Sequence, residues 1–185
     1  MSANTIKQNI KSSALDLFNS KGFEATSIRD LSHKADCSLP MMYYYYESKE
    51  KLLYEIVATD FIAIMNEIFS RAIKTGDLKL FATSFITDVL AFSNEEKLTA
   101  KIALRLHMGS PKNDELNKVL LSYKFSKENI LKNLLIETWR TDKNIEIKTR
   151  LLLDIMYNAM ISFLLTGRPI SVRQVEADVL FLLEN

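Results

Sequence analysis

A short segment near the N-terminus carries side chains suited to binding a phosphate polymer. Four consecutive tyrosines, Tyr43 to Tyr46, are followed by Ser48 and Lys49. A tyrosine hydroxyl and a lysine ammonium are good phosphate partners, and a helix that begins after Ser48 offers free backbone amides to an anion. The alternative is that the tyrosines are packing residues, because tyrosine normally buries its ring and keeps its hydroxyl hydrogen-bonded.

The chain lacks the residue patterns of an enzyme or a metal site. It contains no nucleophile motif, no glycine-rich phosphate loop and no spaced histidine cluster. One cysteine, Cys37, excludes an internal disulfide, and together with only two histidines it cannot easily supply a soft-ligand metal site. We therefore expect a protein that is not an enzyme and that needs no metal or cofactor.

An all-helical fold must position the tyrosine segment. Only 4 glycines and 3 prolines interrupt the chain, and apolar residues recur at helical rather than alternating spacing. Ser27, Ser38 and Ser48 are expected N-caps, and Asp30 completes a capping box with Ser27. The expected helices are Thr5–Lys21, Ser27–Ala35, a short one after Ser38, Lys49–Lys74, Leu78–Phe92, Glu95–Met108, Asn113–Thr141, Ile145–Thr166 and Val172–Leu183.

Length and charge set broad limits on what the chain can be. Its 185 residues allow one small and one larger core, and a net charge of +1 does not by itself indicate a nucleic-acid binder. No tract could span a bilayer, and the polar N-terminus lacks the apolar stretch of a secretory signal. We expect a cytoplasmic protein with no membrane partner.

Three short helices with a tight turn between the second and third are what a helix-turn-helix requires. The segments Thr26–Leu31, Ala35–Ser38 and Tyr43–Leu52 occur in this order, after the pattern Ala14-x-x-Leu17-Phe18-x-x-x-Gly22-Phe23. Together they resemble the TetR family of transcriptional regulators over roughly residues 6–54. Beyond residue 54 only length and helical architecture are similar to that family.

Two positions depart from the family pattern. Asp36 stands in the turn where the family usually carries glycine, and aspartate can adopt a left-handed conformation at modest cost. We therefore expect the turn to be retained. Cys37 replaces a small aliphatic residue, and it is either a small core residue or a redox switch, which would need exposure and a lowered pKa.

The resemblance implies a role for each residue of the DNA-binding surface. Met42 and Tyr46 would pack inward, whereas Leu39, Met41 and Tyr44 would face base edges. Phosphate contacts would come from the third helix and from the start of the next. The residues that the resemblance assigns to DNA binding are Thr26, Arg29, Leu39, Pro40, Met41, Tyr43, Tyr44, Tyr45 and Lys49. Four other lysines, Lys7, Lys11, Lys21 and Lys34, are expected to contribute only a solvated charge field.

The rest of the chain is rich in large apolar residues. In the TetR family a ligand cavity lies within the helices of this region, and methionine and aromatic linings suit a small apolar effector. The candidate lining residues are Phe61, Met65, Phe85, Met108 and Tyr123. The alternative for each is plain core packing, because aromatic residues at helical spacing mostly fill cores.

The last two expected helices carry long apolar faces. In the TetR family these helices form a dimeric four-helix bundle, and a two-fold protein suits a near-palindromic DNA site. The candidate interface residues are Met156, Met160, Phe163, Leu164, Val175 and Val179. The alternative is that these six residues close the core of the monomer, because both uses need the same periodicity.

These inferences combine into one prediction. We expect an all-α protein with a helix-turn-helix head at residues 1–48 and a larger helical domain for effector binding and dimerisation at residues 49–185. It would be a homodimeric, sequence-specific regulator of double-stranded DNA, a repressor released by a small apolar effector. The alternative is a helical protein-interaction adaptor that has lost DNA binding, since the third helix carries few basic residues.

Overall fold

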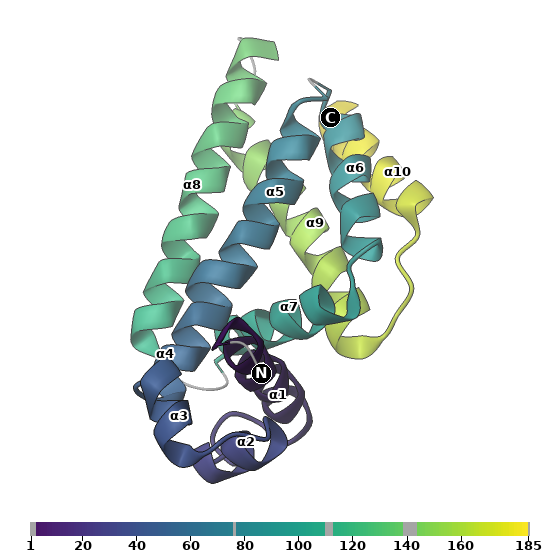
Figure 1. Ribbon diagram of the computed structural model, residues 1–185. Helices are drawn as coiled ribbons and strands as arrows, with labels where there is room; N and C mark the ends of the chain where they lie inside the picture. Colours follow the sequence, from purple (N-terminus) through teal and green to yellow (C-terminus); the bar gives the residue numbers. More distant parts are fainter. Residues whose placement is uncertain (1–2, 76, 110–112, 139–143, 185) are drawn as a thin grey trace. The chain divides into compact units, whose positions relative to one another are not determined.

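The computed structural model describes residues 3–75, 77–109, 113–138 and 144–184 (Figure 1). Every regular element in these ranges is helical, which confirms the predicted all-α class. The elements are α1 (Ala3–Ser20), α2 (Ile28–Lys34), α3 (Leu39–Tyr45), α4 (Lys49–Tyr54), η1 (Glu55–Phe61), α5 (Ile62–Ile73), α6 (Leu78–Leu90), α7 (Asn94–His107), α8 (Asp114–Thr138), α9 (Ile145–Thr166) and α10 (Val172–Glu184).

The predicted helix boundaries hold to within a few residues where the chain is described. The expected end of one helix at Thr141 lies outside the described residues. The long helix expected at Lys49–Lys74 is one helical run, but its middle is a π-helix, η1, and not an α-helix. The apolar pattern did not show this because α- and π-turns differ by only one residue in their hydrogen bonding.

The described residues form two compact units. The first comprises described residues within 1–63 and 93–117, and the second those within 64–92 and 118–185. The predicted boundary between residues 48 and 49 therefore lies inside the first unit. Within this unit α7 packs against both α1 and η1.

Polar contacts fasten α7 to the end of α1 within the first unit. The Nδ2 atom of Asn19 donates to the Leu98 carbonyl at 3.0 Å, and Nη1 of Arg105 donates to the Asn19 carbonyl at 3.2 Å. The apolar core around α1, α2, α3 and α4 lies between these helices. Its most deeply buried members include Ile10, Ala14, Leu31, Met42, Leu52 and Leu53.

The helix starts are capped as the sequence predicts. Ser27 and Asp30 form the reciprocal capping box of α2, and the side chains of Ser38 and Ser48 accept from backbone amides in the first turns of α3 and α4. The turn between α2 and α3 is retained: Asp36 adopts φ 49°, the left-handed conformation that glycine usually supplies. Gly167 ends α9 with φ 71°.

In the second unit α10 packs against α6 and α9, and Figure 1 shows α10 beside α6. Its core includes Phe81, Phe85, Met65 and Met160, all nearly inaccessible to solvent. An ion pair from Lys124 on α8 to Asp154 on α9 (3.3 Å) links another two helices of the unit. None of the helices in the described part of the chain is long and apolar enough to cross a membrane.

The predicted dimer interface needs correction in this unit. Five of the six candidates are buried within the single chain: Met156, Met160, Leu164, Val175 and Val179. A side chain with almost no exposed area cannot contribute area to a contact with a second chain. These five residues close the core of the monomer, which is the alternative that the sequence left open, and only Phe163 is half-buried.

Candidate nucleic-acid interface

The α2–turn–α3 segment has the geometry of a helix-turn-helix. Both helices have 7 residues, and the backbone amide of Cys37 in the intervening turn donates to the Ser32 carbonyl at 3.0 Å. Cys37 is half-buried, and burial raises the pKa of its thiol. A redox switch needs the opposite shift, so the structure favours the packing interpretation of Cys37.

The helix α3 has one inward and one outward face. Met42 is fully buried and Tyr46 is 4% exposed, which confirms the inward placement expected for both. Tyr43 is 55% exposed and Tyr44 is 82% exposed. Of the remaining predicted DNA-binding residues on this helix, Pro40 is exposed, whereas Leu39, Met41 and Tyr45 are half-buried. The ring of Tyr45 packs edge-on against that of Tyr44, with centroids 5.1 Å apart.

Tyr46 is held by a polar relay inside the unit. Its hydroxyl donates to Oε1 of Glu55 at 3.1 Å, and the ammonium of Lys7 donates to the other oxygen of Glu55 at 3.0 Å. Burial, followed by the charge of Glu55, raises the pKa of Tyr46. Tyr46 therefore fastens α3 to η1 and α1, and only the other three tyrosines of the run are available to a partner.

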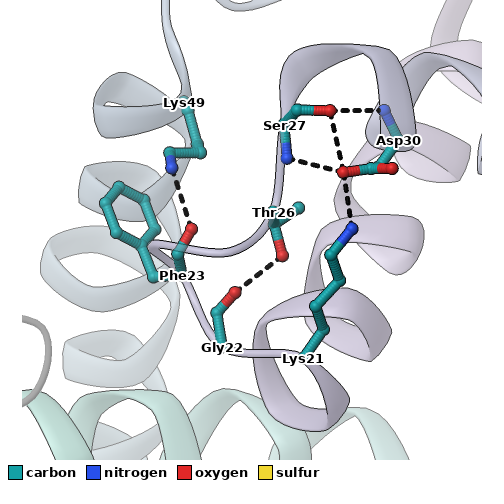
Figure 2. A network of polar contacts seen from close by, with 7 residues as sticks. All are labelled: Lys21, Gly22, Phe23, Thr26, Ser27, Asp30 and Lys49. Carbon is teal, nitrogen blue, oxygen red and sulfur yellow. Dashed lines mark hydrogen bonds and ion pairs between the residues drawn. The ribbon is translucent and has the colours of Figure 1, made fainter.

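Lys49 is fixed by the loop that follows α1. Its ammonium donates to the Phe23 carbonyl at 2.8 Å and lies 4.2 Å from the centroid of the Phe23 ring (Figure 2). An ammonium has three N–H donors, so two remain for another acceptor. Lys49 is half-buried, and its position is set before any partner binds.

A second network orders the start of α2. The carboxylate of Asp30 accepts from the backbone amide and the hydroxyl of Ser27, both at 2.8 Å, and from the ammonium of Lys21 at 2.7 Å (Figure 2). The bond from Lys21, followed by those from Ser27, holds the pKa of Asp30 well below its usual range. The carboxylate therefore stays ionised and its charge is offset locally.

Thr26 lies in the same loop but differs from its predicted role. It is 1% exposed, and its hydroxyl donates to the Gly22 carbonyl at 2.7 Å. Because the Thr26 hydroxyl already donates a hydrogen bond and the residue is buried, Thr26 orders the loop and does not present a hydroxyl to a partner. Arg29, the second residue of α2, is exposed as expected.

Several of these residues line one hollow of about 310 Å³ on the surface of the first unit. Tyr43 on α3 and Lys49, which follows Ser48 at the start of α4, both line it. The full lining is Thr26, Ser27, Ile28, Tyr43, Glu47, Ser48, Lys49 and Glu50. The structure thus brings the predicted phosphate partners Tyr43 and Lys49 to one place, with two carboxylates at the same hollow.

The four remaining lysines of the head are neutralised by ion pairs. The pairs are Lys7–Glu55 (3.0 Å), Lys11–Asp60 (3.0 Å), Lys21–Asp30 (2.7 Å) and Lys34–Asp16 (3.1 Å). These lysines therefore contribute less positive field than their number suggests, in agreement with the minor role expected of them. Among the described ion pairs, none involves Arg29, Lys49 or Lys51.

The five candidate effector residues are divided between the units. Phe61 and Met108 belong to the first, and Met65, Phe85 and Tyr123 belong to the second. Phe61, Met65 and Phe85 are buried, whereas Met108 is 65% exposed at the end of α7 and is not a buried lining. Tyr123 is half-buried, but its hydroxyl oxygen is fully buried.

Sequence reasoning missed the partners that hold the site. The Phe23 carbonyl lies 26 residues from Lys49 and Glu55 lies 48 residues from Lys7, and no local pattern marks either contact. The capping box of Ser27 and Asp30 could be found from its three-residue spacing, but the pairing of Asp30 with Lys21 could not.

Comparison with known proteins relates this geometry to regulators. Residues 10–56 match the family model described as "Bacterial regulatory proteins, tetR family". The chain is 27% identical over 139 residues to the probable HTH-type transcriptional regulator YttP of Bacillus subtilis, with 71% of this chain and 63% of YttP covered. It is 24% identical to the uncharacterized HTH-type transcriptional regulator YdgC of the same organism, with 87% and 82% covered.

Solved structures share the fold. The TetR family transcriptional regulator PfmR from Thermus thermophilus is 22% identical, with 95% of this chain and 97% of PfmR covered and a TM-score of 0.72. A putative transcriptional regulator from Pseudomonas aeruginosa is 18% identical, with 100% and 91% covered and a TM-score of 0.74. The matched part of this chain spans less than two thirds of the length of YttP.

Proposed function

We propose that this chain, whose residues 10–56 match the model of the TetR family of bacterial regulatory proteins, is a homodimeric transcriptional repressor that a small apolar effector releases from DNA. The proposed target is a near-palindromic operator in the cytoplasm. The observation that carries the proposal is the common hollow of Tyr43 and Lys49 beside the exposed face of α3.

The hollow supplies the phosphate contacts. The Tyr43 hydroxyl and the two N–H donors of Lys49 that Phe23 does not use belong to residues of the same hollow and would donate to phosphate oxygens, and Arg29 adds an exposed cation from α2. Phosphate contacts fix the position of a protein on the duplex without selecting sequence. The carboxylates of Glu47 and Glu50 weaken non-specific attraction, which suits a head with little excess charge.

Sequence selection comes from the outward face of α3. Tyr44 projects furthest into solvent, and Leu39 and Met41 are partly exposed beside it. A helix of this kind fits the major groove with its N-terminal residues against base edges. Apolar side chains cannot donate to guanine, but they can pack on the thymine methyl group.

Dimerisation involves exposed rather than buried residues of the last two helices. Ile147 and Leu151 lie four residues apart on α9 and are 49% and 43% exposed, and Phe181 on α10 is 71% exposed. Apolar residues at this spacing share one helix face. We assign the dimer contact to this face, which replaces the buried candidates of the same helices.

Binding to DNA that flanks the protein's own gene tests the proposal. Fluorescence anisotropy at several salt concentrations should show affinity above that for unrelated DNA and a fall in affinity with salt. Tyr43→Phe should weaken binding to all sequences by a similar factor of about 3–10, because it removes a phosphate contact. Tyr54→Phe, which changes an exposed tyrosine outside the hollow, is the matched control.

Two results would contradict the proposal. The first is equal affinity for flanking and unrelated DNA. The second is equal affinity of wild type and Tyr43→Phe at every salt concentration, because the hollow would then make no contact with phosphate.

A further inference from the structure

The side chain of Lys127 on α8 lies against two aromatic rings of the second unit. Its ammonium is 5.0 Å from the centroid of the Tyr123 ring and 5.0 Å from that of the Phe69 ring. Lys127 is half-buried, and within the residues that the structure describes no carboxylate forms an ion pair with it. Burial lowers the pKa of Lys127. The positive charge is therefore partly desolvated and is balanced only by aromatic faces.

An unsatisfied hydroxyl belongs to the same cluster. The Oη atom of Tyr123 is buried and has no hydrogen-bond partner among the described residues. Buried polar atoms are nearly always hydrogen-bonded, so an exception in a native fold needs an explanation. Burial raises the pKa of Tyr123, with a smaller contribution from Tyr157, and burial raises the pKa of Tyr157 to about 12. Both phenols therefore stay protonated at neutral pH and can donate a hydrogen bond.

The neighbouring lysine shows what is unusual about Lys127. Lys124 lies one turn earlier on α8, and its ammonium donates to Oδ1 of Asp154 at 3.3 Å. Its charge is thus offset by a carboxylate within the chain. Of these two lysines, only Lys127 has a charge left to be matched by an added anion.

The surroundings of the cluster are apolar. Phe69 is 4% exposed and packs edge-to-face on the fully buried Phe81, with centroids 5.3 Å apart. The Phe69 ring that Lys127 contacts is therefore part of a buried aromatic core. This combination suits a molecule with one anionic end and an apolar body.

We propose that the Lys127 cluster, defined as Lys127, Tyr123, Phe69 and Tyr157, binds the carboxylate of an apolar monocarboxylate, which is the effector of the regulator. The inference rests on the proposed effector control and names the chemical class of the effector. The ammonium of Lys127 and the hydroxyl of Tyr123 donate to the carboxylate oxygens, and the rings contact the apolar body.

The charge balance selects the ligand class. One uncompensated cation matches one negative charge, whereas a phosphate dianion would bring a second charge that no described neighbour offsets. An amine would be repelled by Lys127, and an alcohol would gain no charge-assisted hydrogen bond. The competing explanation is purely structural: the lysine stem only covers the Phe69 ring while its charge stays in solvent.

Titration calorimetry on the full chain without DNA distinguishes the two explanations. The probes are octanoate, 4-phenylbutyrate, 1-octanol and octylamine at neutral pH. Both carboxylates should bind with one site per chain, and each should bind at least about tenfold more tightly than the alcohol or the amine. Lys127→Met, which keeps the stem and removes the charge, should weaken carboxylate binding by about tenfold or more.

Two further variants sharpen the test. Tyr123→Phe should weaken carboxylate binding by about 3–10-fold while the ligand-free protein melts no lower than wild type, because only an unsatisfied hydroxyl is lost. Lys118→Met removes an exposed charge from another part of α8 and should leave carboxylate affinity within about twofold of wild type. Equal binding of octanoate and 1-octanol, equal affinity of wild type and Lys127→Met, or no binding of either carboxylate would overturn the proposal.

A parallel measurement separates this proposal from the repressor function. Affinity for DNA flanking the gene is measured on the same variants without ligand, where Lys127→Met should match wild type. Loss of specific DNA binding with intact carboxylate binding would refute the repressor proposal alone. Specific DNA binding without carboxylate binding would refute the Lys127 site alone.

Discussion

Removing the ammonium of Lys49 should have two effects: it should lower the stability of the first unit, and it should weaken binding to DNA. The ammonium donates to the Phe23 carbonyl at 2.8 Å and lies 4.2 Å from the centre of the Phe23 ring. A hydrogen bond to a charged group contributes about 1.5–3 kcal/mol, and a cation–π contact at a partly exposed site about 0.5–1 kcal/mol. Because Lys49 is half-buried, we expect Lys49→Met to lower the free energy of unfolding by about 2–3 kcal/mol.

Urea unfolding followed by circular dichroism measures this change. The methionine keeps most of the apolar stem, so the loss reports the ammonium rather than the packing. Lys51→Met is the matched control: it removes an exposed lysine of the same helix and should change the unfolding free energy by less than about 0.5 kcal/mol. In the DNA assay, Lys49→Met should reduce the slope of log affinity against log salt by about one unit.

The two readouts test separate parts of the reasoning. An unfolding free energy of Lys49→Met within about 0.5 kcal/mol of wild type would refute the link between α4 and the loop after α1. An unchanged salt slope would refute the phosphate contact. Loss of stability with an unchanged slope would make Lys49 a purely structural residue.

Three further predictions concern the groove, the dimer and pH. Replacing contacted thymines by uracil removes only methyl groups, so the binding free energy of the wild type for DNA should weaken by about 1 kcal/mol for each buried methyl. The loss should be much smaller in the double variant Leu39→Ala/Met41→Ala. Equal affinity of the wild type for thymine and uracil DNA would exclude methyl recognition. Leu151→Glu should shift sedimentation toward monomer and abolish tight operator binding, whereas a folded dimer would rule out this face of α9. Because the pKa of Asp30 is lowered in the folded state, Asp30 contributes its full stabilisation above about pH 4, the unfolded value, and loses it progressively as pH falls toward the folded pKa. The melting temperatures of wild type and Asp30→Asn should therefore differ most at neutral pH and converge in acid. A constant difference in melting temperature down to about pH 2 would contradict the network.

Local sequence patterns were sufficient to predict the helices and their caps. The capping box of Ser27 and Asp30 joins groups three residues apart, and Gly167 ends α9 directly after its last helical residue. The left-handed turn at Asp36 follows from the tolerance of a single residue for positive φ. Each of these features depends on neighbouring residues, so the order of residue types alone determines it.

The faces of α3 were predicted by resemblance and confirmed by burial. Met42 and Tyr46 point inward while Tyr43 and Tyr44 point outward, although all four have side chains that can pack in a core. A helix that is apolar on every side does not define its buried face, and here the rest of the unit chooses it. The relay from Tyr46 to Glu55 supplies the polar partner that the buried ring needs.

The sequence by itself determined the all-helical class, the helix ends and the helix-turn-helix, because these depend on spacing within a few residues. Tertiary structure alone decided that Lys49 contacts the Phe23 carbonyl, 26 residues away, that the charge of Lys21 is offset by Asp30, and that Thr26 is covered. It also decided that Met156 and Val179 are buried within the single chain. The spacing of apolar residues shows that one face of a helix must be buried, but it does not show which element covers that face. In the same way, the sequence does not reveal which distant residue forms an ion pair with a given charged side chain.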